Sequence, residues 1–184
     1  MKSDRERWDA RYSESEPAEF TPDPLVVEHA GLLAGGRALD LACGRGAESL
    51  FVAARGYVVD AVDISTVALS ALRTRAHDLG LRVRCVSADL DFFPLPEELY
   101  DLVMVFYFFD PGLMAAIERA LKRGGLLFYA TFNHRHTSLN PGFNPDYLVP
   151  PGGLAKFFLA MDTLLDEPEG GGDGNISRLI ARRQ

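Results

Sequence analysis

Short apolar runs alternate with helical segments along most of the chain, and this alternation limits the possible folds more than any other feature. Five runs read as strands, at residues 37–41, 58–62, 82–86, 102–106 and 126–131. The segments that connect them read as helices, at residues 47–54, 65–79 and 111–121. Strands that alternate with helical crossovers form a parallel sheet covered by helices. The predicted fold class is therefore α/β, with a doubly wound, Rossmann-like sheet and helices on both faces.

The two ends of the chain depart from this alternation. Helices are predicted at residues 4–12 and 24–33, separated by a Pro-rich stretch at 17–24. Residues 133–151 are rich in Asn, Pro, Gly and His, and a connection of that length is usually a lid or a binding loop. A helix is predicted at 152–160. Strands at 163–167 and 176–181 are joined by the Gly-rich residues 170–175, which predicts a hairpin and brings the strand number to seven.

Composition and charge narrow the function classes. The chain has 184 residues, a formal net charge of -7 and a pI of about 5.1. Such an acidic chain lacks the positive field that drives binding to nucleic acid, so a small-molecule substrate is favoured. The N-terminus is charged and the apolar runs are short, which favours neither a signal peptide nor a membrane span. Cys43 and Cys85 are expected to lie beyond disulfide reach, which predicts a reduced, cytoplasmic protein.

One segment at the end of the first predicted strand has the composition of a ligand-binding loop. The segment Asp40–Gly46 connects that strand to the helix at 47–54. Gly44 and Gly46 have no side chain where the backbone must turn sharply and approach a ligand. Backbone N–H groups at a helix start favour an anionic group, here a carboxylate. A Gly-rich turn also occurs in sheets without a ligand, so this segment alone does not identify a site.

Acidic residues follow the next two predicted strands. Asp63 closes the second strand and can accept both ribose hydroxyls of a nucleoside, or it can cap the helix that begins near Ser65. Asp60 is the rival carboxylate, but it lies within the strand. Asp89 follows the third strand, where a carboxylate can accept from an adenine amino group. On this basis Asp63→Ala is expected to weaken ligand binding while leaving the fold intact.

Together these motifs resemble class I S-adenosylmethionine-dependent methyltransferases. The segment Asp40-x-Ala42-x-Gly44-x-Gly46 looks like the first motif of that class, with Ala42 where Gly is common. The resemblance extends over the whole chain and implies the strand order 3-2-1-4-5-7-6, with strand 7 antiparallel. The residues from Trp8 to Tyr12 are also similar to the N-terminal helix of the small tellurite-resistance and thiopurine-type group.

The resemblance implies which residues bind the cofactor S-adenosylmethionine. The expected cofactor-binding residues are Arg11, Tyr12, Asp40, Ala42, Cys43, Gly44, Gly46, Asp63, Ile64, Asp89, Leu90 and Phe106. Asp40, Ala42 and Gly44 would hold the methionine amino end, and the Phe106 carbonyl would accept from the amine. Asp63 would bind the ribose, while Ile64, Asp89 and Leu90 would contact the adenine. Arg11 and Tyr12 would close over the cofactor carboxylate, although Arg11 is equally well explained as a solvated helix charge.

The methyl acceptor is expected beyond the ends of the fourth and fifth strands. The expected substrate residues are Trp8, Tyr107, Asp110, Asn133, Arg135 and Tyr147, with Phe106, Phe108, Phe109 and Phe132 as further lining. Strand alternation leaves open whether Tyr107 and Phe109 line a pocket or pack in the core. The candidate catalytic residues are Tyr107, His134 and His136, and the two histidines can equally be exposed loop residues. Two histidines without a third ligand do not make a metal site, so no metal is expected.

The expected reaction is methyl transfer to a small-molecule acceptor by in-line displacement, and its rate comes mainly from orientation. A base is needed only when the acceptor carries a proton of high pKa, so sulfur, selenium or tellurium nucleophiles would not require one. A non-catalytic S-adenosylmethionine-binding module is an alternative. A nicotinamide-dependent oxidoreductase is less favoured, because Ser49 stands where the third Gly of the dinucleotide motif is expected.

The expected organisation is a single methyltransferase domain over residues 1–184. Residues 1–23 would form an N-terminal helix and lid, 24–132 the cofactor-binding core, 133–160 a substrate-side insertion and 161–184 the C-terminal hairpin. We expect a monomer or a weak dimer, because no segment resembles a dedicated interface helix.

Overall fold

The computed structural model describes residues 2–14, 21–170 and 174–184. Its seven strands form one sheet in the order β3-β2-β1-β4-β5-β7-β6, which confirms the predicted topology. β7 runs antiparallel to both of its neighbours, β5 and β6. The chain divides into two compact units, Met1–Pro94 (the first unit) and Leu95–Gln184 (the second unit), which are described in turn.

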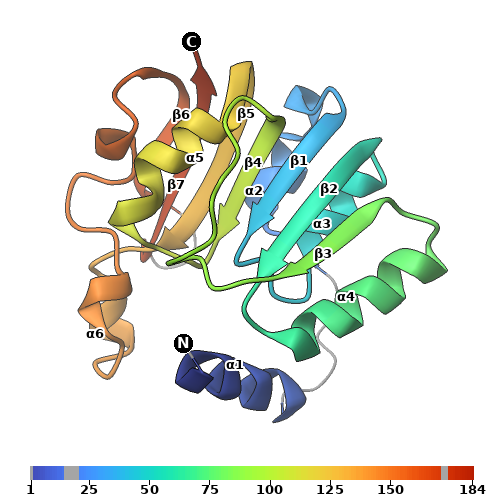
Figure 1. Ribbon diagram of the computed structural model, residues 1–184. Coiled ribbons are helices and arrows are strands. Elements are labelled where there is room, and N and C mark those ends of the chain that lie inside the picture. Colours follow the sequence, from blue (N-terminus) through green and yellow to red (C-terminus); the bar gives the residue numbers. More distant parts are fainter. Residues whose placement is uncertain (1, 15–20, 171–173) are drawn as a thin grey trace. The chain divides into compact units, whose positions relative to one another are not determined.

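The first unit carries three parallel strands and the helices that connect them (Figure 1). Its elements are α1 (Lys2–Glu14), α2 (Pro24–Glu28), β1 (Gly36–Leu41), α3 (Ala47–Ala53), β2 (Tyr57–Asp63), α4 (Thr66–Asp78) and β3 (Val83–Ser87). The central strand β2 buries Tyr57, Val59, Ala61 and Val62, as an apolar strand covered on both faces should. The predicted cap of α4 is confirmed, because the Ser65 hydroxyl accepts from the Ala68 N–H at 3.2 Å.

An ion cluster on the three strands of the first unit accounts for Asp60. The carboxylate of Asp60 accepts from Arg37 on β1 and from Arg84 on β3, both at 2.8 Å. The Asp60 side chain is 3 % exposed, so the two guanidinium groups neutralise a charge that would otherwise be costly to bury. Asp60 therefore holds the strands together, and the rival interpretation of Asp60 as a ribose ligand does not apply.

The second unit carries the remaining four strands. Its elements are β4 (Tyr100–Phe106), α5 (Met114–Ala120), β5 (Leu121–Phe132), α6 (His136–Leu139), β6 (Met161–Gly170) and β7 (Ile176–Arg183). The β4 residues 102–105 are fully buried, in agreement with the predicted strand. In Figure 1, α5 lies along β4 and β5, to which it is connected in sequence.

Several predicted elements differ from the structure. The helix predicted at 152–160 is wrong, because Gly152 and Gly153 adopt φ values of +95° and +74° that end any helix, and only a 3₁₀ turn at Ala155–Phe157 forms. The helix predicted at 24–33 ends at Glu28. Residues 133–151 contain α6 and a 3₁₀ turn at Pro145–Tyr147. Residues 171–173 of the predicted hairpin turn and residues 17–20 of the Pro-rich stretch lie outside the described residues.

The two cysteines lie in different parts of the first unit. Cys43 and Cys85 are both free thiols. Cys43 is buried in the loop after β1, and Cys85 lies on β3 at the edge of the sheet.

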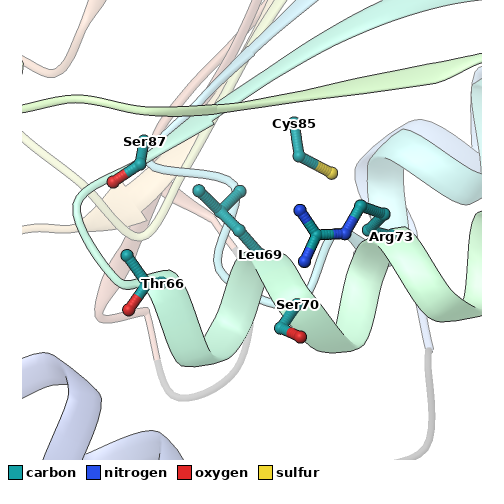
Figure 2. A pocket seen from close by; sticks show the side chains of 6 residues that line it. All are labelled: Thr66, Leu69, Ser70, Arg73, Cys85 and Ser87. Atoms are coloured by element: carbon teal, nitrogen blue, oxygen red, sulfur yellow. The ribbon is translucent and has the colours of Figure 1, made fainter.

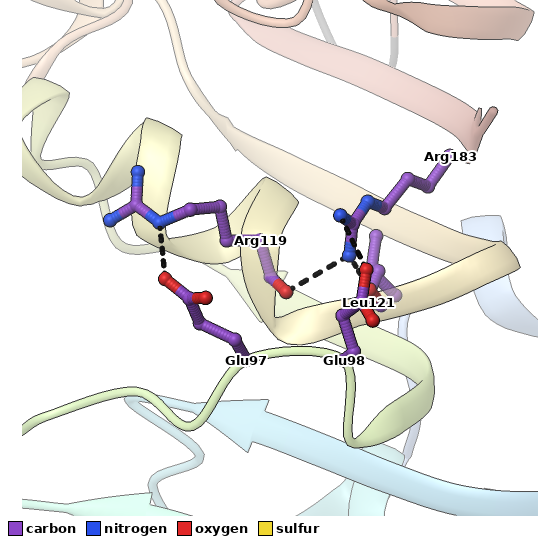
Figure 3. Close-up of polar contacts among 5 residues, drawn as sticks. All are labelled: Glu97, Glu98, Arg119, Leu121 and Arg183. Carbon is purple, nitrogen blue, oxygen red and sulfur yellow. Dashed lines mark hydrogen bonds and ion pairs between the residues drawn. The ribbon is translucent and has the colours of Figure 1, made fainter.

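The C-terminal strand of the second unit is fastened by one arginine (Figure 3). The Arg183 guanidinium donates to the backbone carbonyls of Arg119 and Leu121 and pairs with the Glu98 carboxylate at 3.1 Å. Glu98 has a left-handed φ of +51°, a conformation that side chains other than Gly rarely adopt. Arg183 thus joins the end of β7 to the start of β5 and to the strained residue before β4.

We predict that Arg183→Met lowers the free energy of unfolding by about 2 kcal/mol, because hydrogen bonds to charged groups contribute about 1.5–3 kcal/mol and the Arg183 side chain is largely buried. The matched control is Arg119→Ala, which removes only an exposed pair with Glu97 and should cost less than about 1 kcal/mol. Urea unfolding of both variants measures the difference. Equal losses of unfolding free energy in the two variants would contradict the conclusion that Arg183 fastens β7.

Candidate active site

The Asp63 carboxylate connects the loops that follow β1 and β2. Its Oδ2 accepts from the Gly44 N–H at 2.7 Å, and its Oδ1 accepts from the Ser65 N–H at 2.8 Å. Asp63 is 6 % exposed, and burial raises the pKa of its carboxyl although the two amides act in the opposite direction. Asp63 therefore lies at the end of β2, as predicted from the sequence. Besides the ribose contact predicted for it, its carboxylate connects two loops of the first unit.

This geometry revises the expected effect of Asp63→Ala. Truncation would leave the Gly44 and Ser65 amides without their acceptor, and an unsatisfied buried amide costs about 1–3 kcal/mol. The substitution would therefore weaken the fold as well as any ligand contact. Asp63→Asn keeps an acceptor oxygen and is the more informative variant.

The loop between β1 and α3 has an unusual backbone. Ala42, Gly44 and Gly46 all adopt left-handed φ values, of +53°, +52° and +71°. A Cβ atom on Gly44 would lie 2.5 Å from the Tyr12 hydroxyl, and one on Gly46 would lie 2.5 Å from Leu72 of α4. Gly44 thus allows a close approach of another group to the backbone, whereas Gly46 also allows α4 to pack against the loop. Ala42 adopts the left-handed conformation with a side chain, at a steric cost.

Buried carboxylates gather beside this loop. Asp40 is 1 % exposed and accepts from the Ser49 hydroxyl at 2.6 Å. Burial, and then the neighbouring Glu48 carboxylate, raise the pKa of Asp40 well above its ordinary value. Burial also raises the pKa of Glu48, which accepts from the Asp23 N–H at 2.9 Å. The sequence analysis did not single out Glu48, because an acid in the first turn of a helix is common.

Helix α1 contributes Tyr12 to the same place. The Arg45 guanidinium donates to the Tyr12 carbonyl at 2.7 Å and lies over the Tyr12 ring. Burial, and then the charge of Asp63, raise the pKa of the Tyr12 phenol to about 12, so this hydroxyl remains protonated at neutral pH. Arg11 lies over the ring of Trp8, with 5.1 Å to the ring centroid, which gives Arg11 a packing role on its own helix.

The predicted adenine-binding residues follow β2 and β3. Ala88 donates from its N–H to the Asp63 carbonyl at 3.0 Å, which continues the pairing of the two strands into the loops. The Asp89 carboxylate accepts from the Asp91 N–H at 3.2 Å, an interaction that shapes its own turn. Ile64 and Leu90 are partly exposed. These residues lie on neighbouring loops, as the motif spacing predicted.

The residues of this edge fit S-adenosylmethionine by charge. Asp40, Glu48 and Asp63 are carboxylates whose pKa values are raised by burial, so they favour a cation that would offset their charges. S-adenosylmethionine carries two cationic groups, an ammonium and a sulfonium. Gly44 has no side chain where the Tyr12 hydroxyl approaches the backbone, and Asp63 stands at the end of β2.

A shallow pocket of about 130 Å³ lies between α4 and β3 (Figure 2). Its lining residues are Thr66, Leu69, Ser70, Arg73, Cys85 and Ser87. Figure 2 shows the Arg73 guanidinium directed toward the Cys85 thiol. Pockets for drug-sized ligands have volumes of about 300–1,000 Å³, so this hollow is too small for the cofactor.

In the second unit, Tyr107 stands out among the predicted substrate residues. It follows β4 directly, has a left-handed φ of +55° and is 49 % exposed. Its ring lies 5.3 Å from that of Phe132, which stacks on His136 at 4.0 Å. Phe143 meets both of these rings edge-on. We call Tyr107, Phe132, His136 and Phe143 the aromatic cluster; the sequence analysis missed Phe143, which lies in the irregular loop.

Two predicted substrate residues have structural contacts. Asn133 is 1 % exposed; its amide donates to the carbonyls of Pro168 and Gly174, and its side-chain oxygen accepts from the Arg135 N–H. The Arg135 side chain pairs with Glu169 at 2.7 Å. These contacts hold the segment after β5 against the hairpin of β6 and β7.

The other residues predicted to line the site of the methyl acceptor are either packed in the protein interior or exposed at its surface. Phe109 is 4 % exposed and packs edge-on against Phe157, which settles its open assignment in favour of packing. Phe106 is buried at the end of β4, and the Phe108 carbonyl accepts from the buried Tyr129 hydroxyl. Asp110 accepts from the Gly112 N–H and caps a 3₁₀ turn. Tyr147 is 48 % exposed, and Trp8 lies on α1 of the first unit.

The two candidate histidines differ in their surroundings. His136 Nδ1 lies 3.0 Å from the side-chain nitrogen of Asn175. An amide nitrogen only donates, so with this orientation Nδ1 accepts and the ring proton of neutral His136 lies on Nε2. His134 Nδ1 is buried and has no hydrogen-bond partner among the described residues. In this tautomer neither nitrogen of His136 has a lone pair free to accept a proton.

Within the described ranges, no group of three or more His, Cys, Asp or Glu residues is arranged to hold a metal ion. No helix in those same ranges is long and apolar enough to cross a membrane.

Comparisons with known proteins identify relatives of the chain. A family model described as "Methyltransferase domain" matches residues 38–125. A ubiquinone biosynthesis O-methyltransferase of Burkholderia orbicola (strain MC0-3) is 30% identical over 182 residues, which cover 83% of this chain and 78% of the relative. The enzyme of the same name from Pseudomonas putida (strain GB-1) is 31% identical over 137 residues, 69% of this chain and 58% of the relative.

Solved structures share the fold. TehB from Haemophilus influenzae has a TM-score of 0.77 at 16% identity, with 96% of this chain and 67% of that chain covered. A structure concerned with conversion of a disulfide bond into a thioacetal group during echinomycin biosynthesis has a TM-score of 0.74 at 23% identity, with 98% and 91% covered. At these identities the likeness concerns the fold alone.

The fold and the relatives together define a Rossmann-like methyltransferase. The chain belongs to the class I S-adenosylmethionine-dependent methyltransferases, enzymes that transfer the methyl group of that cofactor. The alternative of a nicotinamide-dependent oxidoreductase is thereby set aside.

We predict that Asp40→Asn reduces the pH dependence of stability of the ligand-free protein. Because the folded-state pKa of Asp40 is raised above its ordinary 3.8, its contribution is fully present below pH 3.8 and is lost as the pH rises through the folded-state pKa. Removal of the charge removes this loss. Unfolding free energies from pH 5 to pH 9 measure the effect.

The control for Asp40 is Ser49→Ala. This change keeps the carboxylate but removes the hydrogen bond that lowers its pKa, so the loss of stability should extend to higher pH. An unchanged pH profile in both variants would contradict the assignment.

Proposed function

We propose that the first unit binds S-adenosylmethionine at the carboxyl ends of β1 to β3, and that its methyl group is transferred to a small-molecule acceptor by in-line displacement. The observation that carries the proposal is the set of buried carboxylates around a left-handed glycine loop. When bound, the cofactor supplies a methyl group already activated on a sulfonium. The protein then contributes mainly by orienting the two reactants.

Each cofactor contact is assigned from the place of the residue in the first unit. Asp40 and the backbone of 42–46 hold the methionine end, where the Asp40 side chain accepts from the ammonium group. Asp63 accepts from the ribose, and Ile64, Asp89 and Leu90 contact the adenine. Tyr12 covers the loop as a protonated donor.

The acceptor is assigned to the aromatic cluster of the second unit. Strained backbone conformations are retained where function requires them, and Tyr107 combines such strain with an exposed ring. Aromatic rings of this kind favour a flat or apolar acceptor. Since neutral His136 has no free lone pair in this arrangement and the Nδ1 of His134 is buried, we assign an acceptor atom that ionises readily by itself, as an acidic hydroxyl or a thiol does.

Two observations bear on this acceptor class. The relatives from Burkholderia and Pseudomonas are named O-methyltransferases, which favours an oxygen acceptor. Membership of the tellurite-resistance and thiopurine-type group, for which the residues from Trp8 to Tyr12 are the support, would instead favour a soft acceptor. We also propose the organisation into an N-terminal helix and lid (1–23), a cofactor-binding core (24–132), a substrate-side insertion (133–160) and a C-terminal hairpin (161–184).

We predict that S-adenosylmethionine and S-adenosylhomocysteine raise the melting temperature and that NAD does not. A ligand at 100 times its Kd stabilises the folded state by about 2.7 kcal/mol. In Asp63→Asn the shift with S-adenosylhomocysteine should be strongly reduced. A shift with NAD alone would contradict the proposal.

We predict that His136→Phe, which preserves the stack on Phe132, lowers kcat by less than about tenfold, because removal of a general base costs about 10²–10⁴-fold. Tyr107→Ala should instead lower kcat/KM by more than about tenfold through loss of acceptor orientation. Single-turnover assays with phenols and thiols of graded pKa measure both effects and identify the acceptor atom.

A 10²-fold loss of kcat in His136→Phe would identify His136 as the general base. Absence of any methylated product across the panel would favour a non-catalytic binding module.

A further inference from the structure

Helix α1 has few residues that could hold it in place by hydrophobic burial. From Asp4 to Glu14 its apolar residues are Trp8, Ala10 and Tyr12, and the remainder are charged or polar. A surface helix is normally fixed by an apolar stripe of about a third of its circumference. The position of α1 therefore depends strongly on its polar contacts.

One of these contacts joins α1 to the start of α4. The Asp9 carboxylate accepts from the Ser65 hydroxyl at 2.6 Å and from the Val67 N–H at 3.1 Å through Oδ1. Its Oδ2 accepts from the Thr66 hydroxyl at 3.3 Å. A carboxylate at a helix N-terminus also interacts favourably with the helix dipole. Figure 1 shows α1 beside this end of α4.

A second set of contacts lies one turn further along α1. Tyr12 is three residues after Asp9, so the two side chains share a face of the helix. The Tyr12 hydroxyl reaches Gly44, and the Tyr12 carbonyl accepts from Arg45. Asp9 therefore fixes the register in which Tyr12 covers the cofactor loop.

We propose that Asp9 is a positioning residue that latches α1 over the 42–46 loop, and that the cofactor enters and leaves only when the contacts of Asp9 with Ser65, Thr66 and Val67 open. The inference rests on the proposed cofactor site. The contacts of Asp9 with Ser65, Thr66 and Val67, none of which touches the cofactor in this proposal, would set how often α1 opens. The hydrogen bond from Ser65 lowers the pKa of Asp9, which keeps the latch charged at neutral pH.

The chain supplies its own reporter for this motion. Trp8 is its single tryptophan and precedes Asp9 directly. Its ring lies 6.0 Å from the ring of Tyr12 and 5.1 Å from the Arg11 guanidinium carbon. Tryptophan emission therefore reports on the surroundings of α1, independently of methyl transfer.

The experiment is stopped-flow binding of S-adenosylhomocysteine to the full chain, with Trp8 emission as the signal. In Asp9→Ala we expect the association and dissociation rates both to rise by about tenfold, equivalent to about 1.4 kcal/mol, with a smaller change in Kd. Asp9→Asn, which keeps an acceptor oxygen, should give an intermediate increase and serves if Asp9→Ala folds poorly. The matched control is Asp4→Ala, which removes the same charge from the same helix at an exposed pair with Arg7. Its rates should change less than twofold.

The outcomes separate the latch from the proposed function. Unchanged exchange rates in both Asp9 variants, with normal binding, would overturn the latch and leave the cofactor site intact. A faster dissociation alone would make Asp9 a contributor to affinity and would also overturn the gate. If S-adenosylhomocysteine fails to bind the wild-type chain, as judged by thermal shift, the proposed function itself fails.

Discussion

The hydrogen bonds of the Asp63 carboxylate organise the ligand-binding edge of the first unit. One oxygen holds the Gly44 amide and the other holds the Ser65 amide, so a single side chain sets the spacing of the loops after β1 and β2. Ser65 then caps α4 and donates its hydroxyl to Asp9. The position of α1, and with it that of Tyr12 over Gly44, therefore depends on the same strand end.

The buried carboxylates of the first unit differ in whether a neighbouring positive charge neutralises them. Asp60 is neutralised by two arginines and supports the sheet. The carboxyls of Asp40 and Glu48 lie near one another, and their pKa values are raised by burial. Uncompensated buried charge destabilises a ligand-free protein, and a cationic ligand removes that penalty. The same residues that weaken the ligand-free protein would thus favour S-adenosylmethionine at the proposed site.

The sequence predicted those parts of the molecule that follow from local pattern. The alternation of apolar runs and helices predicted the sheet, and the motifs at Asp40–Gly46, Asp63 and Asp89 predicted neighbouring loops. The long-range partners could not be predicted, since Asp9 meets Ser65 across 56 positions of the chain and Asn133 binds carbonyls of the distant hairpin. The helix expected at 152–160 failed because two successive glycines adopt positive φ. Phe143 was missed because an irregular loop carries no periodicity.

The central claim is that S-adenosylmethionine binds at the loops joined by Asp63. Amide hydrogen exchange of the full chain, with and without S-adenosylhomocysteine, tests it most directly, because exchange reports local opening peptide by peptide. Bound S-adenosylhomocysteine should slow amide exchange in peptides that contain residues 42–46 and 63–65. Binding that leaves exchange in both loops unchanged would contradict the claim and would place the ligand elsewhere.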